Sequence, residues 1–494
     1  AICGRICPHE KQCEGSCIRG IKGEPVSIGA MEAYIGDLSI ENNYELSIEV
    51  DERAKDKRVA VIGSGPAGLT CAAFLARRGV KVTIYEKHDK LGGLLTHGIP
   101  DFRLPREVVE KTIEKILDLG VETKLNQELG RDFEIEDLAK KYDAVFVAIG
   151  ANIPAKMNVE GEGLEGVYGG NYLLEYNKHP NYTGKKVAII GGGNVAIDVA
   201  RTSTRVGDYN VSMFCLEDRA NMPASEEEIE EAVEEGVKLD CGWGPKEILT
   251  ENGKVTGIVL KRCTSVKDAD GRFNPQYDEN DTKTVKCSHV FLSIGQTTIW
   301  GDLLKGTKVE IDGVRVKADK LTYQTTDPDV FIGGDVYTGP RFAIDAIAAG
   351  KEAAISIHRY VQPHSSLTIG RNRRDFIELD KNNIKVESYD NSSRQIPGTD
   401  NSFDHKKSFR DAKLTFTEEQ VKAETARCLG CGASVVDPNK CIGCGICTTK
   451  CEFDAIHLNR DLPECSTMRK SEDKLKYILP YGAKQAIKIK FKKK

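Results

Sequence analysis

The amino-acid sequence predicts an α/β protein built from two nucleotide-binding units of one kind, with cysteine-rich segments near both ends. The first observation is a pair of glycine-rich loops, at residues 63–68 (GSGPAG) and 191–196 (GGGNVA). The second is their setting, because each loop follows an apolar run typical of a buried parallel strand and opens an apolar helix. One such loop occurs often by chance, whereas two in one chain indicate a protein that holds two dinucleotides.

The composition limits the classes to which this chain can belong. Its 494 residues are enough for roughly three domains, and a net charge of -5 gives no general preference for nucleic acid. Sixteen cysteines, grouped mainly near the ends of a chain without a visible signal peptide, favour metal binding over disulfide bonds. The uncharged run 59–76 is broken by Pro66 and several glycines, so we predict a strand, turn and helix, no membrane span and a cytoplasmic location. The chain begins with Ala1 rather than Met, so we allow for residues upstream of it.

The first loop has the features of a pyrophosphate site. Its second glycine, Gly65, lets the backbone approach the phosphates, and Gly68 lets the helix pack closely on the strand. The next strand, 81–85, ends at Glu86, where a carboxylate is expected to accept hydrogen bonds from ribose hydroxyls. The residues predicted for this site are Gly63, Gly65, Pro66, Ala67, Gly68, Glu86 and Lys87.

The second loop repeats this arrangement after a strand at 185–190. The three glycine positions are taken by Gly191, Gly193 and Ala196, and the following strand, 211–216, ends beside Glu217. The residues predicted for this site are Gly191, Gly193, Asn194, Ala196, Glu217 and Arg219. An acidic amphipathic helix is predicted over 226–235 and a long helix over 342–360.

Over residues 1–362 the chain resembles a flavoprotein family that includes the small subunit of glutamate synthase and the flavin arm of dihydropyrimidine dehydrogenase. Besides the two loops, the resemblance rests on Gly92-Gly93, the segments 99–105 (IPDFRLP) and 327–336 (DPDVFIGGDV), and the crossover strand 144–150. It implies that the first loop and Glu86 hold FAD and that Gly334 and Asp335 contact the flavin ribityl chain. The FAD-site residues that it adds are Gly92, Gly93, Gly150, Gly334 and Asp335.

The same resemblance bears on which nicotinamide cofactor binds the second loop. Relatives that use NADPH usually carry two arginines where this chain has Leu216 and Glu217, before a retained Met-Pro-Ala run at 222–224. A carboxylate accepts hydrogen bonds from a free ribose 2'-OH and repels a 2'-phosphate. We therefore predict NAD(H) over NADP(H), with Arg219 leaving room for some use of NADP(H).

Hydride transfer between nicotinamide and flavin needs no protein nucleophile or general base, so no catalytic residue is assigned. A disulfide reductase shares the two-nucleotide architecture but requires a pair of redox cysteines beside the flavin. Neither the segment after Glu86 nor the second nucleotide unit contains a closely spaced pair, so this alternative is not favoured.

The N-terminal cysteines have a spacing suited to iron–sulfur clusters or zinc. They resemble the second half of the cysteine-rich domain of the glutamate synthase family, in which two [4Fe–4S] clusters share ligands between two cysteine groups. This implies that Cys17 serves one cluster and that Cys3, Cys7 and Cys13 contribute to its neighbour. Glu32 falls where some relatives place a non-cysteine ligand, and the first cysteine group is absent from this sequence.

Near the C-terminus, Cys441, Cys444, Cys447 and Cys451 form the Cys-x2-Cys-x2-Cys-x3-Cys motif of ferredoxins. The motif departs from the usual pattern because Glu452, rather than proline, follows its fourth cysteine. Cys428 and Cys431, with Cys465 or Cys451, predict either a second cluster or a zinc site, and the sequence leaves both open.

The predicted organisation is a second nucleotide domain inserted into a split first one, flanked by the two cysteine regions. The expected boundaries are 1–56 for the cysteine-rich segment, 57–150 and 297–362 for the FAD domain, 151–296 for the NAD domain, 363–425 for an extended linker, and 426–494 for a ferredoxin-like module with a basic tail.

Together these features predict an FAD and iron–sulfur oxidoreductase subunit that exchanges hydride with NAD(H) and passes single electrons to partner subunits. The leading interpretation, from the family resemblance and the appended ferredoxin module, is an electron-bifurcating or transhydrogenase-type complex. One alternative is a glutamate synthase small subunit, which its partner would distinguish. Another is a non-catalytic assembly subunit with a decayed flavin site, which the intact glycines, Glu86 and Asp335 argue against.

Overall fold

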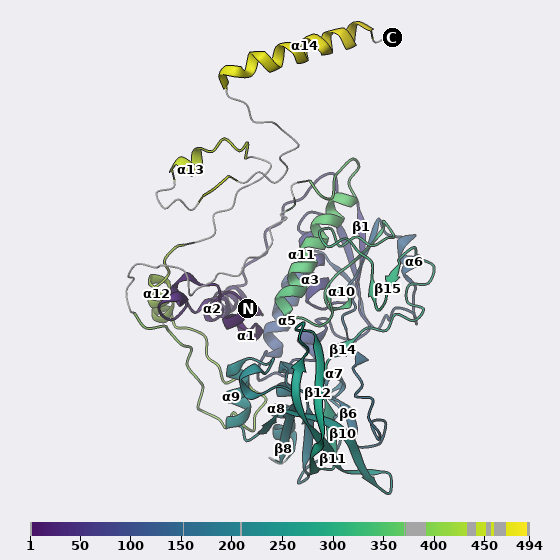
Figure 1. The fold of residues 1–494 in the computed structure, drawn as a ribbon, viewed down its shortest axis with the longest axis vertical. Coiled ribbons are helices and arrows are strands. Elements are labelled where there is room, and N and C mark those ends of the chain that lie inside the picture. The colour runs from purple at the N-terminus through teal and green to yellow at the C-terminus, as the bar shows by residue number, and fades with distance from the viewer. Residues whose placement is uncertain are drawn as a thin grey trace. The chain divides into compact units, whose positions relative to one another are not determined.

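The computed structural model describes residues 2–151, 153–207, 210–369, 371, 392–431, 441–450, 456–458 and 471–491 (Figure 1). The chain divides into two compact units, Ala1–Cys431 and Gly432–Lys494. All the elements that form the nucleotide sites belong to the first unit.

The first nucleotide domain is built on a five-stranded sheet in the order β17-β4-β1-β2-β3, and every neighbouring pair is parallel. Its strands are β1 (Arg58–Ile62), β2 (Lys81–Tyr85), β3 (Glu122–Lys124), β4 (Ala144–Val147) and β17 (Val330–Ile332). Because β17 pairs with β4 although they are far apart in the chain, the segment between them forms an insertion.

The insertion is the second nucleotide domain, whose sheet has the order β6-β13-β7-β8-β9 and is also parallel. Its strands are β6 (Val167–Gly169), β7 (Val187–Ile190), β8 (Val211–Cys215), β9 (Lys238–Cys241) and β13 (His289–Leu292). Two parallel sheets, one interrupting the other, confirm the predicted fold class.

Helices cover the faces of both sheets. In the first domain they are α3 (Pro66–Ala76), α4 (Leu94–His97), α5 (Arg106–Leu117), α6 (Ile135–Ala139), α10 (Asp335–Thr338) and α11 (Ala343–Tyr360). In the second they are α7 (Gly170–Tyr176), α8 (Asn194–Val206), η3 (Arg219–Asn221) and α9 (Glu226–Glu234). Helices α3 and α11 run side by side (Figure 1), and a Cβ added at Gly350 would lie 2.2 Å from the Ala67 carbonyl oxygen. This close approach fixes α11 against the start of α3.

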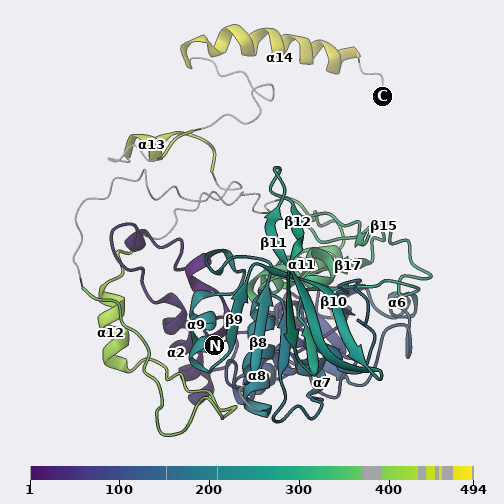
Figure 2. The same cartoon turned by 60° about the horizontal axis from the view of Figure 1, so that its bottom comes forward.

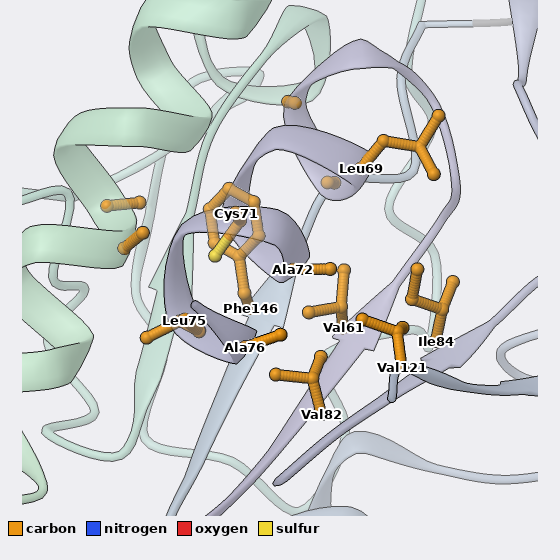
Figure 3. Close-up of a cluster of buried hydrophobic side chains, with 14 of the residues drawn as sticks. Val61, Leu69, Cys71, Ala72, Leu75, Ala76, Val82, Ile84, Val121 and Phe146 are labelled. Atoms are coloured by element: carbon orange, nitrogen blue, oxygen red, sulfur yellow. The ribbon is translucent and has the colours of Figure 1, made fainter. Parts of the chain in front are cut away.

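The core of the first domain lies between α3 and the sheet. Figure 3 shows Leu75 and Cys71 of α3 near Phe146 of β4, with Val61 and Ile84 from the neighbouring strands. All five side chains are completely buried. Burying a side chain of this size contributes about 1.5–3 kcal/mol, so the apolar runs that predicted these strands also supply the stability of the domain.

Additional strands of the first unit are antiparallel and were not predicted from the sequence. The largest group is a three-stranded sheet of β10 (Trp243–Glu251), β11 (Lys254–Lys267) and β12 (Phe273–Lys286), which lies beside β8 (Figure 2). Two short pairs join β5 (Ile153–Pro154) to β14 (Gln296–Thr297), and β15 (Ile311–Asp312) to β16 (Arg315–Val316).

The N-terminal segment forms α1 (Cys3–Ile6), η1 (His9–Lys11), η2 (Ile18–Ile21) and α2 (Ile28–Glu41). Within the range predicted as an extended linker, residues 392–425 instead include most of helix α12 (Glu418–Ala426), as well as Phe416, which is 3% exposed. This corrects the prediction for the described part of that range. Ion pairs join this segment to the rest of the unit, from Arg394 to Glu14 and from Lys413 to Glu227.

The second unit contains α13 (Ile446–Lys450), η5 (Ser471–Asp473) and α14 (Lys474–Phe491). Among the described residues of the whole chain, no helix is both long enough and apolar enough to cross a membrane.

Candidate dinucleotide and iron–sulfur sites

Both glycine-rich loops border one cavity of about 1630 Å³ in the first unit. This volume is larger than a typical small-molecule pocket of about 300–1,000 Å³, as expected of a space for two dinucleotides. The predicted residues that line it are Gly63, Gly65, Pro66, Ala67, Glu86, Lys87, Gly93, Gly150, Gly191, Gly193, Asn194, Glu217, Gly334 and Asp335. Four predicted residues do not line it, namely Gly68, Gly92, Ala196 and Arg219.

The first loop is held to Glu86 by hydrogen bonds. The backbone N–H of Ser64 donates to Glu86 Oε2 at 2.9 Å, and the Ser64 hydroxyl donates to the same oxygen at 2.5 Å. The backbone N–H of His88 donates to the other carboxylate oxygen at 3.0 Å, and the backbone N–H of Gly92 donates to Ser64 Oγ at 3.0 Å. Glu86 is only 4% exposed, so its position is fixed before any ligand is considered. Sequence reasoning missed Ser64, whose hydroxyl within the loop was the available signal.

The glycines of this loop meet two different needs. Gly65 caps α3 in an extended conformation, and a Cβ added there would meet no atom within 4 Å, which leaves the space in front of the helix open. A Cβ at Gly68 would lie 2.0 Å from the Gly63 carbonyl oxygen, so Gly68 is required for packing. The open space at the N-terminus of α3 fits a pyrophosphate.

The end of β17 brings Gly334 and Asp335 beside the first loop. Gly334 has φ +77°, and a Cβ added there would lie 2.9 Å from the Cβ of Ala67. Asp335 accepts a hydrogen bond from the backbone N–H of Arg341 at 3.2 Å, and burial raises the pKa of its carboxyl to about 6. The two residues border the cavity from the C-terminal part of the split domain.

The second loop has the same shape, and residues at the end of the Met-Pro-Ala run are hydrogen-bonded to it. Gly193 caps α8 in an extended conformation, and a Cβ there would also meet no atom within 4 Å. The backbone N–H of Ala224 donates to the Gly192 carbonyl at 3.1 Å, and the N–H of Ser225 donates to Asn194 Oδ1 at 3.1 Å. Because the space in front of Gly193 is empty, the N-terminus of α8 leaves room for a second pyrophosphate.

Glu217 lies next to this loop, whereas the arginines near it are already paired. A Cβ added at Gly192 would lie 2.9 Å from Glu217 Oε2, which shows how closely the carboxylate approaches the loop. Arg219 forms a bidentate ion pair with Glu226, and Arg201 is buried against Glu231 and Glu235. Glu217 is therefore a carboxylate that faces the cavity beside the second loop, and Lys11, whose ammonium donates to the Pro223 carbonyl at 3.3 Å, lines the same cavity.

The antiparallel sheet supplies an apolar wall that sequence reasoning did not find. Its cavity-lining residues are Trp243, Pro245, Phe273, Pro275 and Tyr277. A Cβ added at Gly244 would lie 2.4 Å from the Tyr277 ring and 2.9 Å from the Leu216 side chain, so the wall packs directly against the end of β8. Alternating aromatic and proline residues after Phe273 were the signal in the sequence.

Two ionic contacts join the nucleotide domains beside the cavity, and neither was predicted. Arg103 pairs with Asp198 at 2.6 Å and also with Glu228. Burial, with the nearby carboxylates of Asp198 and Glu231, raises the pKa of Glu228 to about 7, although the Arg103 guanidinium opposes this shift. Lys87, predicted as a cofactor residue, pairs with Glu175 of α7 at 2.9 Å.

The structure brings together some of the N-terminal cysteines. A hydrogen bond from Cys7 lowers the pKa of Cys3, and the nearby Glu32 carboxylate opposes that shift. Burial, then Glu14 and more weakly Glu32, raise the pKa of Cys13, whose sulfur lies 3.6 Å from His9 Nδ1. The charge of Glu32 therefore contributes to the electrostatic environment of Cys3 and Cys13. No group of three or more metal-ligating side chains is close enough to hold an ion in the part of the chain that the structure describes.

This cysteine segment borders the dinucleotide cavity. Ile6, Lys11 and Gln12 line the cavity, and the Cys7 sulfur accepts a hydrogen bond from the backbone N–H of Ile344 at the start of α11. Residues 342 and 343, which precede it, line the same cavity. Cys17, the fourth predicted ligand of this segment, is the N-cap residue of η2 and is partly exposed.

The other cysteines predicted as metal ligands lie at the end of the first unit and in the second unit. Cys428 and Cys431 follow α12 at the end of the first unit, and both are exposed. Cys441, Cys444 and Cys447 are also exposed, and the last lies in α13. Cys451 and Cys465 lie outside the described residues.

Comparison with known proteins gives three family matches that together span most of the chain. The family described as "Pyridine nucleotide-disulphide oxidoreductase" matches residues 57–350. "Dihydropyrimidine dehydrogenase domain II, 4Fe-4S cluster" matches residues 1–44, and "4Fe-4S binding domain" matches residues 434–457. These matches identify the cysteine-rich ends as iron–sulfur regions.

Individual relatives include subunits of several enzymes. The glutamate synthase [NADPH] small chain of Escherichia coli is 35% identical over 380 residues, covering 73% of this chain and 80% of that protein. The NADP(+)-dependent formate dehydrogenase subunit beta of Moorella thermoacetica is 33% identical over 466 residues, covering 87% of this chain and 65% of that protein. The NADPH-Fe(3+) oxidoreductase subunit beta of Geobacter sulfurreducens is 32% identical over 470 residues, covering 87% and 69%.

Among solved structures, FprA from Mycobacterium tuberculosis has the same fold, with a TM-score of 0.54 at 18% identity over 62% of this chain and 84% of that one. The predicted family resemblance is confirmed. The chain belongs to the pyridine nucleotide-disulphide oxidoreductase family and is an NAD(P)H-dependent flavin and iron–sulfur oxidoreductase, related to subunits of larger enzymes.

Proposed function

We propose that this chain exchanges hydride with NAD(H) at a bound FAD and passes single electrons through [4Fe–4S] clusters to partner subunits. The observation that carries this proposal is the single cavity, lined by both glycine loops and by residues of the N-terminal cysteine segment. FAD supplies the chemistry of accepting a hydride and releasing its electrons one at a time. The protein's contribution is to hold two dinucleotides together and to place thiols beside them.

The residues around the first loop fit FAD. The open N-terminus of α3 at Gly65 would receive the pyrophosphate, and the fixed carboxylate of Glu86 would accept ribose hydroxyls. Gly93, Gly150, Gly334 and Asp335 line the rest of the same wall. Lys87 is engaged with Glu175, so its role would be to hold the two domains together beside the site.

The residues around the second loop fit NAD(H). Gly193 and Asn194 at the start of α8 would receive the pyrophosphate, and Glu217 would accept hydrogen bonds from a free 2'-OH. A 2'-phosphate would meet this carboxylate without a free guanidinium beside it, because Arg219 is paired with Glu226. The names of the relatives specify NADPH or NADP(+), so a preference for NAD(H) would set this chain apart from them.

The test is an anaerobic spectral titration of the purified chain with NADH and then NADPH. Rapid bleaching of the flavin and cluster absorbance by NADH, with NADPH much slower, is the expected result. Bleaching by NADPH alone would overturn the NAD(H) preference but keep the oxidoreductase. Absence of bound FAD would instead favour a non-catalytic assembly subunit.

We further propose that the partners form an electron-bifurcating or transhydrogenase-type complex in the cytoplasm. The ferredoxin-type region at 434–457 supports this proposal, and the match to the glutamate synthase small chain covers only 73% of this chain. Relatives that extend along 87% of this chain are subunits named for formate dehydrogenase and iron reduction. A glutamate synthase small subunit is the second candidate, favoured by 80% coverage of the E. coli chain, and co-purification of a large amidotransferase subunit would select it.

The C-terminal cysteines provide two further candidate metal sites. We propose a [4Fe–4S] cluster on Cys441, Cys444, Cys447 and Cys451, and either a second cluster or zinc on Cys428 and Cys431 with Cys465 or Cys451. Iron and zinc analysis of the anaerobically purified chain, before and after Cys428→Ser, distinguishes them. We also retain the domain boundaries 57–150, 151–296 and 297–362 as a proposal.

A further inference from the structure

Helix α12 and the residues around it contact the N-terminal cysteine segment through buried charges. Glu424 is completely buried, and its carboxylate accepts hydrogen bonds from the backbone N–H of Ser27 at 2.8 Å and of Gln395 at 2.8 Å. Arg427 pairs with the same carboxylate and donates to the carbonyls of Glu24 and Pro25. Side chains from the far end of the first unit thus bind backbone atoms of residues 24–27.

These contacts cap helix α2. Ser27 is the N-cap of α2 but offers no side-chain cap, and the first turn contains no acidic residue. The backbone N–H groups there are satisfied from outside the helix, by Glu424 at Ser27 and by Glu14 at Gly29 (3.0 Å). Glu14 is 4% exposed and is itself paired with Arg394 at 2.6 Å. A helix start without its own cap depends on such partners for its position.

Helix α2 in turn carries Glu32, whose charge reaches the N-terminal thiols. Helix α1, which begins at Cys3, packs directly on α2, because a Cβ at Gly4 would lie 2.5 Å from the Gly29 carbonyl oxygen. The position of α2 therefore sets the position of Glu32 and of the Cys3–Cys7 pair. Figures 1 and 2 both show α12 beside α2.

We propose that α12 and Arg427 form a clamp that positions the N-terminal cysteine-rich segment, with Glu424 as its positioning residue. Arg19 completes the clamp from the cysteine segment, because its guanidinium donates to the Arg427 carbonyl at 3.1 Å. Cys428 directly follows Arg427, so the clamp also restricts the position of this cysteine within the first unit. The proposal rests on the proposed function only in taking Cys3, Cys7 and Glu32 to surround an iron–sulfur cluster.

The test compares Glu424→Gln with Glu418→Gln in the natural-length chain. Glu418 lies on the same helix, but its side chain is 67% exposed and its one ion pair among the described residues is with Lys422, so it is a matched control. Cys441→Ser and Cys444→Ser in both proteins remove the ferredoxin motif from the spectra. The readouts are hydrogen exchange of residues 24–41, the electron paramagnetic resonance spectrum of the reduced N-terminal iron, and flavin content.

In Glu424→Gln we expect exchange at the start of α2 to rise at least about tenfold, because a charged acceptor of two N–H groups is lost. The spectrum should also change, whereas Glu418→Gln should match the parent and both should keep FAD. Glu424→Asp should restore the spectrum in part. If the exchange and the spectrum of Glu424→Gln equal those of Glu418→Gln, the clamp is overturned. It is also overturned if the faster exchange in Glu424→Gln extends equally to α3 and α8.

If Glu424→Gln does not fold, Arg394→Gln tests the same cap from its more exposed edge. A smaller rise in exchange at Gly29 would support the clamp, and no change would overturn it. Failure of NADH to bleach the parent flavin would refute the proposed function, while the exchange data would still decide the clamp.

Discussion

The two glycine loops have similar sequences and backbones but differ in what surrounds their acidic residues. Glu86 is buried and accepts three hydrogen bonds from Ser64 and His88, so the first site is organised by its own domain. Glu217 is partly exposed on the cavity, and among the described residues no hydrogen bond to its carboxylate is found. A preorganised site suits a resident cofactor, whereas an open one suits a ligand that binds and leaves.

The difference extends to the walls of the sites. The first loop is enclosed by β17 and α11 of its own domain, as Gly334 and Gly350 show by their contact with Ala67. The second loop is completed from outside its parallel sheet, by the antiparallel sheet and by Arg103 of the first domain. Changes at the first loop should therefore remove a cofactor, whereas changes at the second should alter kinetics or selectivity.

The largest effect is expected from Gly65→Val. Gly65 has φ -66° and open space where a Cβ would lie, so valine fits the empty protein and occupies the space proposed for the pyrophosphate. We expect a folded protein without FAD, seen as loss of the flavin absorbance. Gly163→Val is the control, because Gly163 also has open space but does not line the cavity. If Gly65→Val retains stoichiometric FAD, the FAD pyrophosphate does not bind at the N-terminus of α3.

Gly193→Val is the corresponding change at the second loop. Gly193 has φ -94° and the same open space, so the protein should fold and keep its FAD. Because the nicotinamide would be displaced, flavin reduction by NADH in stopped-flow measurements should slow by about 100-fold. Loss of FAD in this variant, or unchanged reduction, would contradict the assignment of different cofactors to the two loops.

The parallel strands and glycine loops could be predicted because both depend on local sequence. Apolar runs next to the glycine loops predicted β1, β2, β7 and β8 to within two residues, and the helix expected at 342–360 is α11. Residues whose roles depend on distant partners could not be found. The sequence around Arg103 does not reveal its ion pairs, because Asp198 and Glu228 are distant in the chain. Nor does the sequence around Glu424 indicate that this residue is buried.

A tenfold effect is expected from Glu217→Ala on nicotinamide selectivity. Removing a carboxylate that accepts hydrogen bonds from the ribose should reduce the ratio of kcat/KM for NADH to that for NADPH by about tenfold. Arg219→Gln is the control, since Arg219 is paired with Glu226 at the surface and does not line the cavity. If this kcat/KM ratio is unchanged in Glu217→Ala, or changes equally in the control, Glu217 does not bind the ribose.

The smallest effect concerns the contact that joins the second domain to the first. Burial raises the pKa of Glu228 to about 7, so the folded protein binds its proton more tightly than the unfolded chain does. The stability gained from this proton is complete below the unfolded pKa and is lost as the pH rises through about 7. Glu228→Gln, which cannot ionise, should therefore weaken the fall in stability between pH 6 and pH 8 by about 1 kcal/mol.

The measurement for Glu228 is urea unfolding followed by Trp243 fluorescence in a Trp300→Phe background, since the chain has two tryptophans and Trp243 belongs to the second domain. Asp335, whose pKa burial also raises, is present in both proteins and cancels in the difference. Glu226→Gln is the control, because Glu226 lies on the same helix but is exposed, and its pair with Arg219 lowers the pKa of its carboxyl instead of raising it. Equal pH slopes in Glu228→Gln and the parent would mean that Arg103 keeps Glu228 ionised throughout. The second site would then be held by a permanent ion pair, and its contact with the first domain would be as fixed as the hydrogen bonds around Glu86.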